Sequence, residues 1–191
     1  MDLTLAGLMA LMLSLSPPER VTALSLASEQ HETTPERSAR YGAIASDILD
    51  VAEAHDVEPL FVGPRARERT ALLLLATTFH ESDGWHRSID TGAKRGDGGA
   101  SWCIAQIHLP GAHRTPEGWA GPDLIADRQR CLRAAVRVLR ASLALCARRP
   151  RPDQLSAYVS GSCSVSVDVS RRRWRTFEEL VRQVASLTRG G

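Results

Sequence analysis

Residues 71–85 read ALLLLATTFHESDGW, and this stretch predicts the centre of the fold. Its first nine residues carry no charge and show no polar face, which predicts a helix that is buried on every side. The uncharged run is too short to span a bilayer, so we expect no stable membrane insertion. Asp83 and Gly84 then form a stop signal, because glycine readily adopts the left-handed conformation that ends helices.

Glu81 is therefore expected in the last turn of a buried helix. Burial disfavours the charged form of a carboxylate, and the negative end of the helix dipole acts in the same direction. Both effects predict a raised pKa for Glu81, and a carboxyl group that stays protonated near neutral pH can serve as a general acid. The structural alternative is a surface glutamate that ends an ordinary core helix. This stretch alone does not distinguish the two, so other parts of the sequence are needed.

The composition indicates an ordinary globular protein. At 191 residues the chain is large enough for one domain that buries a core without a metal or a disulfide. The formal net charge is only +2, although every basic residue except Lys94 is arginine. This balance is no reason to expect nucleic-acid binding, whereas a mildly basic protein suits an anionic polymer such as a cell wall.

Apolar periods and capping signals predict a mainly α fold. Residues 3–15 form an apolar run without a basic start or a nearby cleavage site, so we expect a first helix and no clear signal peptide. Further helices are predicted to begin at Ser16-Pro17, Thr34-Pro35, Gly63-Pro64 and Asp127. A short helix is predicted to end near Gly161, and the last helix is predicted to cover 168–187. Residues 84–122 lack a helical period, and within them only 101–108 could form a short strand. We expect N-terminal helices over 1–60 packed on a domain over 61–191, as one globular unit with a small irregular or short β lobe.

Four cysteines, at positions 103, 131, 146 and 163, allow three pairings. If residues 124–147 form one helix, Cys131 and Cys146 are about 22 Å apart and cannot pair. We favour Cys131–Cys163, while four reduced and buried thiols are at least as good an alternative. The chain has no Cys-x-x-Cys pair, and His80-Glu81 lacks a second histidine at position 84, so we expect no metal and no cofactor.

Three short segments carry a resemblance to a known family. Glu81-Ser82 is followed by CIAQI at 103–107 and by AYVSG at 157–161. In this order the segments resemble the Glu-Ser, Gly-Leu-Met-Gln-Ile and Ala-Tyr-Asn-Ala-Gly motifs of the lytic transglycosylases of the lysozyme-like superfamily. The resemblance covers residues 64–165, and it implies a lysozyme-like domain.

The chain departs from the family pattern at several positions. Cys103 stands where glycine is usual, and Ala105 replaces a larger apolar residue. Val159-Ser160 replaces Asn-Ala, which removes an amide that would contact sugar. Extra residues in the glycine-rich loop 92–99 separate the first two motifs. Such departures resemble a divergent branch of the kind found among phage and mobile-element proteins.

The resemblance also implies a reaction and a set of site residues. Glu81 would protonate the glycosidic oxygen between N-acetylmuramic acid and N-acetylglucosamine, then take the proton of the sugar's own 6-hydroxyl as a 1,6-anhydro ring closes. The implied substrate contacts are Ser82 beside the acid, Gln106 through its amide to an acetamido group, Ile107 in the groove, Tyr158 through its hydroxyl, and Trp85 or Trp102 stacked on a sugar. Each has a structural alternative, from a polar helix end to a core aromatic.

Three other functions stay open. A hydrolytic muramidase would need a second carboxylate about 5–9.5 Å from Glu81, and the candidates are Asp83, Asp90 and Asp97. A non-catalytic structural or cell-wall-binding protein of a virion or secretion apparatus would keep the fold without turnover. A DNA-binding module would use the arginines at 128, 130, 133, 137 and 140, which are most simply a solvated helix face.

The expected partners follow from the favoured reading. They are peptidoglycan glycan strands, and proteins of a virion or a secretion channel. Because the chain shows no clear signal, we expect it to be virion-associated or to reach the periplasm or cell wall through a holin, a virion or a secretion channel.

Overall fold

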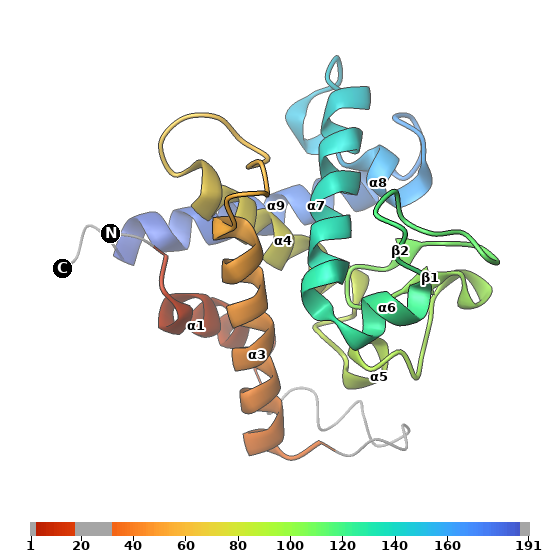
Figure 1. The fold of residues 1–191 in the computed structure, drawn as a ribbon. Coiled ribbons are helices and arrows are strands. Elements are labelled where there is room, and N and C mark those ends of the chain that lie inside the picture. Colours follow the sequence, from red (N-terminus) through yellow and green to blue (C-terminus); the bar gives the residue numbers. More distant parts are fainter. Residues whose placement is uncertain (1–2, 18–31, 188–191) are drawn as a thin grey trace.

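The computed structural model describes residues 3–17 and 32–187, and it confirms a mainly α fold with a small β lobe (Figure 1). The α-helices are α1 (Leu5–Leu15), α3 (Thr34–Glu53), α4 (Ala66–Glu81), α5 (Arg87–Asp90), α6 (Gly121–Ala126), α7 (Arg128–Leu145), α8 (Ser156–Ser160) and α9 (Val167–Leu187). Two short 3-10 helices, η2 (Asp97–Gly99) and η3 (Arg151–Asp153), and two strands, β1 (Ser101–Trp102) and β2 (Ile107–His108), are the other elements of these described ranges. The helix predicted to follow Ser16 falls on 18–31, outside the described residues. No helix in the described ranges is long and apolar enough to cross a membrane.

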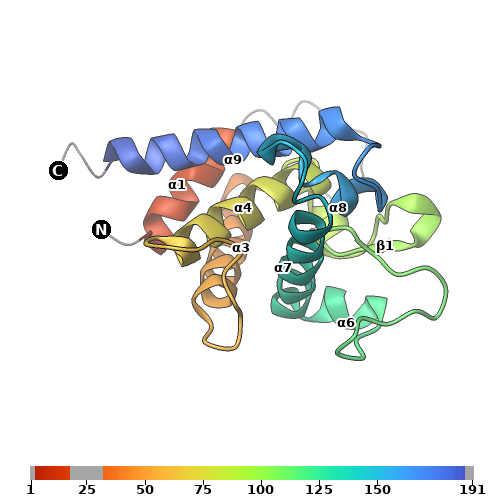
Figure 2. The same ribbon diagram turned by 90° about the horizontal axis from the view of Figure 1, so that it is seen from above.

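Helix α4 forms the centre of the molecule, as its apolar run predicts. Side chains 72–76 are fully buried, because α9 packs along one side of α4 while α3 and α7 pack on the other (Figure 2). Each buried leucine contributes about 1.5–3 kcal/mol through the removal of apolar surface from water. The helix ends at Glu81, and Gly84 has a φ of +75° while its N–H donates to the Phe79 carbonyl oxygen at 2.9 Å. The predicted stop signal is therefore confirmed.

Polar side chains cap both ends of helix α3. The cap at its start comes from neighbouring residues, and the cap at its end comes from helix α4. The Thr33 and Glu36 side chains form a capping box, with Glu36 accepting from the Thr33 N–H at 2.8 Å. At the other end, the Arg67 guanidinium donates to the carbonyl oxygens of Ala52 at 2.8 Å and Ala54 at 2.9 Å. Helix α4 thus satisfies carbonyl groups that the end of α3 leaves open.

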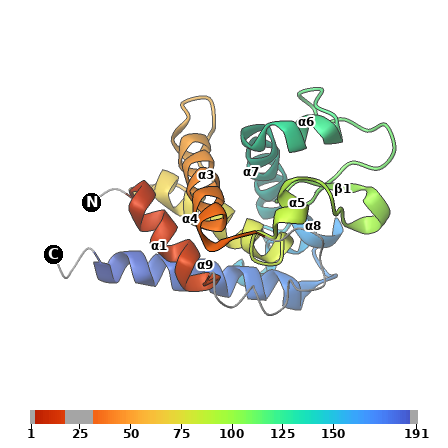
Figure 3. The same ribbon diagram turned by 90° about the horizontal axis from the view of Figure 1, so that it is seen from below.

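The β lobe lies beside α7, at the end of α4 that carries Glu81 (Figure 3). The run 101–108 is a two-stranded hairpin rather than one strand, with Trp102 paired to Ile107 in antiparallel register. Cys103 and Gln106 have φ values of 59° and 48°, and these left-handed residues reverse the chain within the run. The prediction of a single strand is wrong because the apolar residues at its centre form the turn.

Two disulfides attach the lobe and the loop after α8 to α7. They join Cys103 to Cys131 and Cys146 to Cys163. The predicted pair Cys131–Cys163 is wrong, and so is the alternative of four reduced thiols. The reason is geometric, since Cys131 lies in the first turn of α7 beside the hairpin, whereas Cys163 lies beyond its other end. The expectation that Cys131 and Cys146 do not pair is confirmed.

Residues 124–147 do not form one helix, and the helix predicted to begin at Asp127 is α7, which starts directly after Asp127. This residue has φ −134° and ψ 103°, and its side chain accepts from the Arg130 N–H at 3.2 Å, so it ends α6 and caps α7. The arginine face of α7 is not simply solvated either. All five of its arginines form ion pairs with carboxylates, which are Asp47, Asp56, Asp90, Glu58, Glu117 and Asp127.

Candidate active site

A cavity of about 640 Å³ lies where α4, the β hairpin, α7 and α8 meet. Its lining comes from all three segments that carry the family resemblance: Glu81 from the first, Gln106 and Ile107 from the second, and 157–161 from the third. The rest of the lining is Gly96, Asp97, Ser101, His108 and Val138. Segments separated widely in sequence therefore converge on one hollow that contains a carboxyl group.

The Glu81 carboxyl group is buried and held on one side. Its side chain is 14% exposed, and Arg173 donates to its Oε1 from Nε at 3.1 Å and from Nη2 at 2.6 Å. Burial raises the pKa of Glu81, the charge of Asp97 raises it further, and Arg173 opposes both, so that the net pKa lies above the usual value. Within the described chain, no residue donates a hydrogen bond to Oε2. This oxygen is left to carry a proton.

Arg173 is a site residue that the sequence reasoning missed. It belongs to α9, its side chain is 7% exposed, and its Nη1 also donates to the Val169 carbonyl oxygen at 3.2 Å. The residue lies next to Trp174, which is buried in the core, but it is one of three consecutive arginines at 171–173. Nothing local distinguishes it from its neighbours, because its partner is far away in sequence.

Tyr158 connects the second and third segments. Its hydroxyl donates to the Ala105 carbonyl oxygen at 2.5 Å, and its backbone N–H donates to Ser142 Oγ at 2.9 Å. Burial, and then the charge of Glu81, raise the pKa of Tyr158 well above its ordinary value, so the hydroxyl remains a hydrogen-bond donor. In this structure Tyr158 therefore holds the hairpin turn against α8, and its hydroxyl donates to Ala105 and not to Glu81.

Gln106 uses its amide within the protein. Oε1 accepts from the Gly96 N–H at 3.0 Å, and Nε2 donates to the Cys103 carbonyl oxygen at 2.9 Å. A Cβ on Gly96 would lie 2.4 Å from Oε1, so a side chain at position 96 would force the Gln106 amide to move. The expected contact with an acetamido group would have to use the second amide N–H. Ile107, only 5% exposed, lies beside Gln106 in the cavity wall.

The structure does not bring Ser82 or the two tryptophans to the cavity. Ser82 is fully buried, where its hydroxyl donates to the Thr78 carbonyl oxygen at 2.6 Å and accepts from the Trp85 N–H at 3.0 Å. Trp85 is a core residue that packs against Tyr41 and Phe79. Trp102 packs so closely on Gly121 that a Cβ there would lie 2.1 Å from its ring. In this structure Ser82 is therefore a polar residue at a helix end, and the two tryptophans pack within the protein.

Asp97 is the one of the three candidate second carboxylates that lines the cavity. Its Oδ2 accepts from Ser101 Oγ at 2.5 Å and lies 3.5 Å from His108 Nδ1. Asp90 instead accepts two hydrogen bonds from Arg128, both at 3.0 Å, and Asp83 lies in the turn after α4 with φ 51°. If a second carboxylate takes part in the reaction, the geometry favours Asp97.

His80, next to Glu81, has a structural place. Burial, and then the charges of Arg173 and Arg172, lower the pKa of His80 to about 4, so the ring is neutral at physiological pH. Its Nε2 lies 2.8 Å from Thr176 Oγ1 on α9. In the parts of the chain with described coordinates, no three histidine, cysteine, aspartate or glutamate side chains gather as metal ligands would.

The cavity therefore combines a buried acid, a fixed cation behind it and a second carboxylate in its wall. Carboxyl groups in such surroundings are suited to proton transfer. Comparisons with protein-family models, curated proteins and solved structures found no match to this chain, so its chemistry has to be argued from its own residues.

Proposed function

We propose that this protein is a peptidoglycan lytic transglycosylase in which Glu81 acts as both acid and base. The observation that carries the proposal is the Glu81 carboxyl group, which is buried at the end of a core helix and faces the cavity formed by the three resembling segments. Burial favours the protonated form that the first step requires. The family resemblance supplies the substrate class, which is the glycan strand of peptidoglycan.

The proposed reaction begins with transfer of the Glu81 proton to the glycosidic oxygen. The bond between C1 of N-acetylmuramic acid and this oxygen breaks, and its electron pair leaves with N-acetylglucosamine. Positive charge develops at C1, where the 6-hydroxyl oxygen of the same muramic acid forms the new bond. The 6-hydroxyl proton returns to the Glu81 carboxylate, so the products contain a 1,6-anhydro ring and no added water. Acid and base assistance of this kind contributes about 10²–10⁴ in rate.

Arg173 supports both halves of this cycle. Both of its hydrogen bonds to Glu81 go to Oε1, which leaves Oε2 available for the transferred proton. After the first transfer Glu81 is a buried carboxylate, and the Arg173 cation stabilises that charge. The opposing influences of burial and Arg173 on the pKa of Glu81 suit a group that first donates and then accepts a proton.

The two disulfides support the proposed location. Disulfides persist in oxidising surroundings, such as the bacterial periplasm and virion surfaces, and are rare in a reducing cytosol. A peptidoglycan substrate lies in the same surroundings. We therefore propose that the protein acts at the cell wall or in the periplasm, or as part of a virion or secretion channel, with glycan strands as its partner.

A hydrolytic muramidase is the second candidate, and Asp97 is the observation that favours it. Two carboxyl groups facing one cavity could activate water or form a covalent intermediate. The products distinguish the two reactions, because hydrolysis adds one water that the transglycosylase reaction does not. A wall-binding protein without turnover would release no product.

Mass spectrometry of fragments released from purified peptidoglycan tests the proposal. The wild type should release muropeptides that end in 1,6-anhydro-muramic acid, and Glu81→Gln should release none. Glu53→Gln makes the same chemical change on the exposed surface of α3 and should leave release unchanged. Reducing ends one water heavier would establish the muramidase, and a folded wild type that releases nothing would remove the enzymatic proposal.

A further inference from the structure

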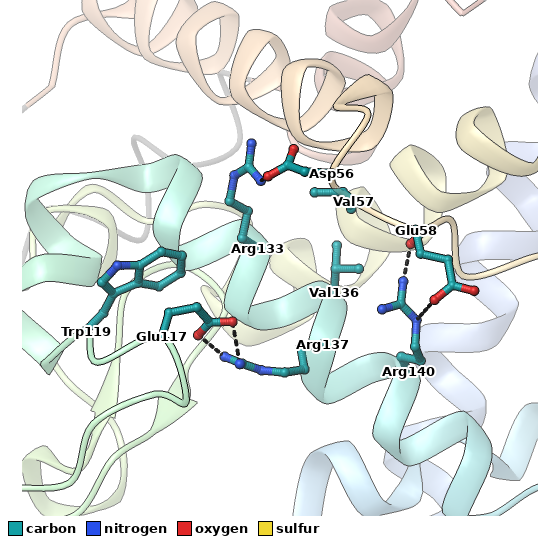
Figure 4. Close-up of a pocket in the computed structure, with 9 residues that line it drawn as sticks. All are labelled: Asp56, Val57, Glu58, Glu117, Trp119, Arg133, Val136, Arg137 and Arg140. Atoms are coloured by element: carbon teal, nitrogen blue, oxygen red, sulfur yellow. Dashed lines mark hydrogen bonds and ion pairs between the residues drawn. The ribbon is translucent and has the colours of Figure 1, made fainter.

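A second pocket lies against α7, and Figure 4 shows the residues that line it. Its volume is about 430 Å³, and it is formed by the segment after α3, the loop before α6 and α7 itself. Residues two apart on a helix point about 200° apart, so Val136 faces this pocket whereas Val138 faces the cavity beside Glu81. The two pockets share a helix but no lining residue.

The floor of the second pocket is apolar and one end is aromatic. Val57 and Val136 lie between the charged side chains in Figure 4, and they are 7% and 2% exposed. Trp119 lies at one end, half-buried, with the Arg130 guanidinium 5.8 Å from the centre of its ring. An indole beside an apolar floor offers a flat surface to a ligand with an apolar face.

Ion pairs between α7 and the two loops surround this floor (Figure 4). The pairs are Arg133 with Asp56 at 2.6 Å, Arg140 with Glu58 at 3.6 Å, and Arg137 with Glu117. Each arginine of the pocket thus has a carboxylate partner, and the formal charges cancel. An anion would have to displace a carboxylate, and a cation would have to displace an arginine, so the pocket gives little advantage to either.

A neutral ligand with several hydroxyl groups could hydrogen-bond to both the arginines and the carboxylates without breaking the balance of charge. Each hydroxyl can accept from a guanidinium N–H and donate to a carboxylate oxygen at the same time. The C–H face of a pyranose ring is apolar and flat, which suits the two valines and the indole. A saccharide therefore fits the side chains of this pocket better than an ion does.

We infer that the pocket between α7 and the loops at 56–58 and 117–119 is an accessory saccharide-binding site, which takes one or two pyranose rings. That this sugar belongs to a glycan strand rests on the proposed function, whereas sugar binding itself does not. Because the site lies on another side of α7 from Glu81, it would hold a neighbouring part of the wall while the cavity acts on its own strand.

Titration of the full chain with N,N′,N″-triacetylchitotriose tests the inference without turnover. The indole N–H signals of the four tryptophans are followed by NMR, and that of Trp119 is identified by its loss in Trp119→Phe. The Trp119 signal should shift in a saturable manner. The signal of Trp85 should stay in place, because this side chain is fully buried in the core.

Variants then locate the binding. Arg137→Met should weaken the affinity at least tenfold, and Glu117→Gln, which keeps the side-chain shape, is a second variant should the first fold poorly. Arg148→Met removes an exposed arginine outside the pocket and should leave the affinity unchanged. An unmoved Trp119 signal, or an equal affinity in the pocket variants, would overturn the inference. A shift caused by a muropeptide stem peptide but not by the sugar would overturn it as well.

The outcome is independent of the reaction at Glu81. Fragment release from peptidoglycan reports the proposed function, and chitotriose binding at Trp119 reports the accessory site. A chain that binds the sugar but releases nothing keeps the accessory site and loses the enzymatic proposal, and the reverse result does the opposite.

Discussion

Replacement of Arg173 by methionine tests the electrostatic account of Glu81. Methionine keeps much of the buried volume but removes the cation and both hydrogen bonds to Glu81 Oε1. The folded pKa of Glu81 is already raised by burial above the ordinary glutamate value of 4.5, and loss of Arg173 removes the influence that lowers it. We therefore expect the variant to hold the Glu81 proton up to a higher pH.

The sign and size of the stability change follow from this proton. A folded pKa above the unfolded value means that folding takes up a proton, so stability is lost as the pH rises from 4.5 through the folded pKa. The variant should lose more stability over this window, because its folded carboxyl is harder to ionise. Removal of one partner from a buried ion pair costs about 3–5 kcal/mol. Protonation of Glu81 avoids most of that cost in acid, so the variant should approach the wild type near pH 4.

Urea denaturation at pH 4 and at pH 8 measures the difference. The destabilisation of Arg173→Met should be below about 1 kcal/mol at pH 4 and several-fold larger at pH 8. Arg175→Met removes an exposed arginine two residues further along α9 and should give a small, nearly pH-independent change. An Arg173→Met destabilisation that is equal at both pH values would refute the reasoning, since it would mean that only packing was lost.

Further predictions concern the walls of the cavity. The Cys103→Ser and Cys131→Ser double variant opens a disulfide with a sequence separation of 28, so thermal unfolding should show a loss of about 2–4 kcal/mol, and dithiothreitol should destabilise the wild type by more because it also reduces Cys146–Cys163. Gly96→Ala places a Cβ 2.4 Å from Gln106 Oε1 and should cost about 1–3 kcal/mol, and addition of Gln106→Ala should relieve part of this cost in a double-mutant cycle. Tyr158→Phe leaves the Ala105 carbonyl oxygen without its 2.5 Å donor and should cost about 1–3 kcal/mol in urea denaturation, while Tyr41→Phe, which removes only longer bonds of 3.1 Å to Ser16 and 3.2 Å to the Gly84 carbonyl oxygen, should cost less.

The local elements could be predicted because their signals are local. The apolar run before Glu81 predicts a helix that the core surrounds, and Thr33 with Glu36 forms a capping box within one turn. The hairpin was harder to predict, because its turn needs left-handed conformations at Cys103 and Gln106, and cysteine and glutamine seldom adopt them. The pairing of the cysteines depended on which segments the folded chain brings to each end of α7, and no local pattern in the sequence indicates this.

The site could be predicted in part. Motif order indicated some of its residues, whereas others are placed only by tertiary packing. Glu81, Gln106, Ile107 and Tyr158 line one cavity, so motif order was enough to gather them. Ser82 and Trp102 match the residue types that a sugar site uses, but neither side chain faces the cavity. The Ser82 hydroxyl bonds back to the end of α4, and the Trp102 ring packs on Gly121. Arg173 reaches Glu81 from the last helix of the chain, and no spacing rule connects two charges that meet only after the core has packed.

The pairing of Glu81 with Arg173 explains why one carboxyl group could perform both proton transfers. A buried glutamate without a cation would keep its proton and be a poor acid, whereas an exposed glutamate beside an arginine would be ionised before the substrate arrives. Here burial raises the pKa of Glu81 while Arg173 opposes the rise, and the cation contacts only one of the two oxygens. The proton can therefore leave from Oε2 with the resulting charge already compensated, and it can return to the same oxygen. A second carboxylate is not needed to balance either step, which is why the single-acid reaction is the one we place first despite Asp97 in the wall.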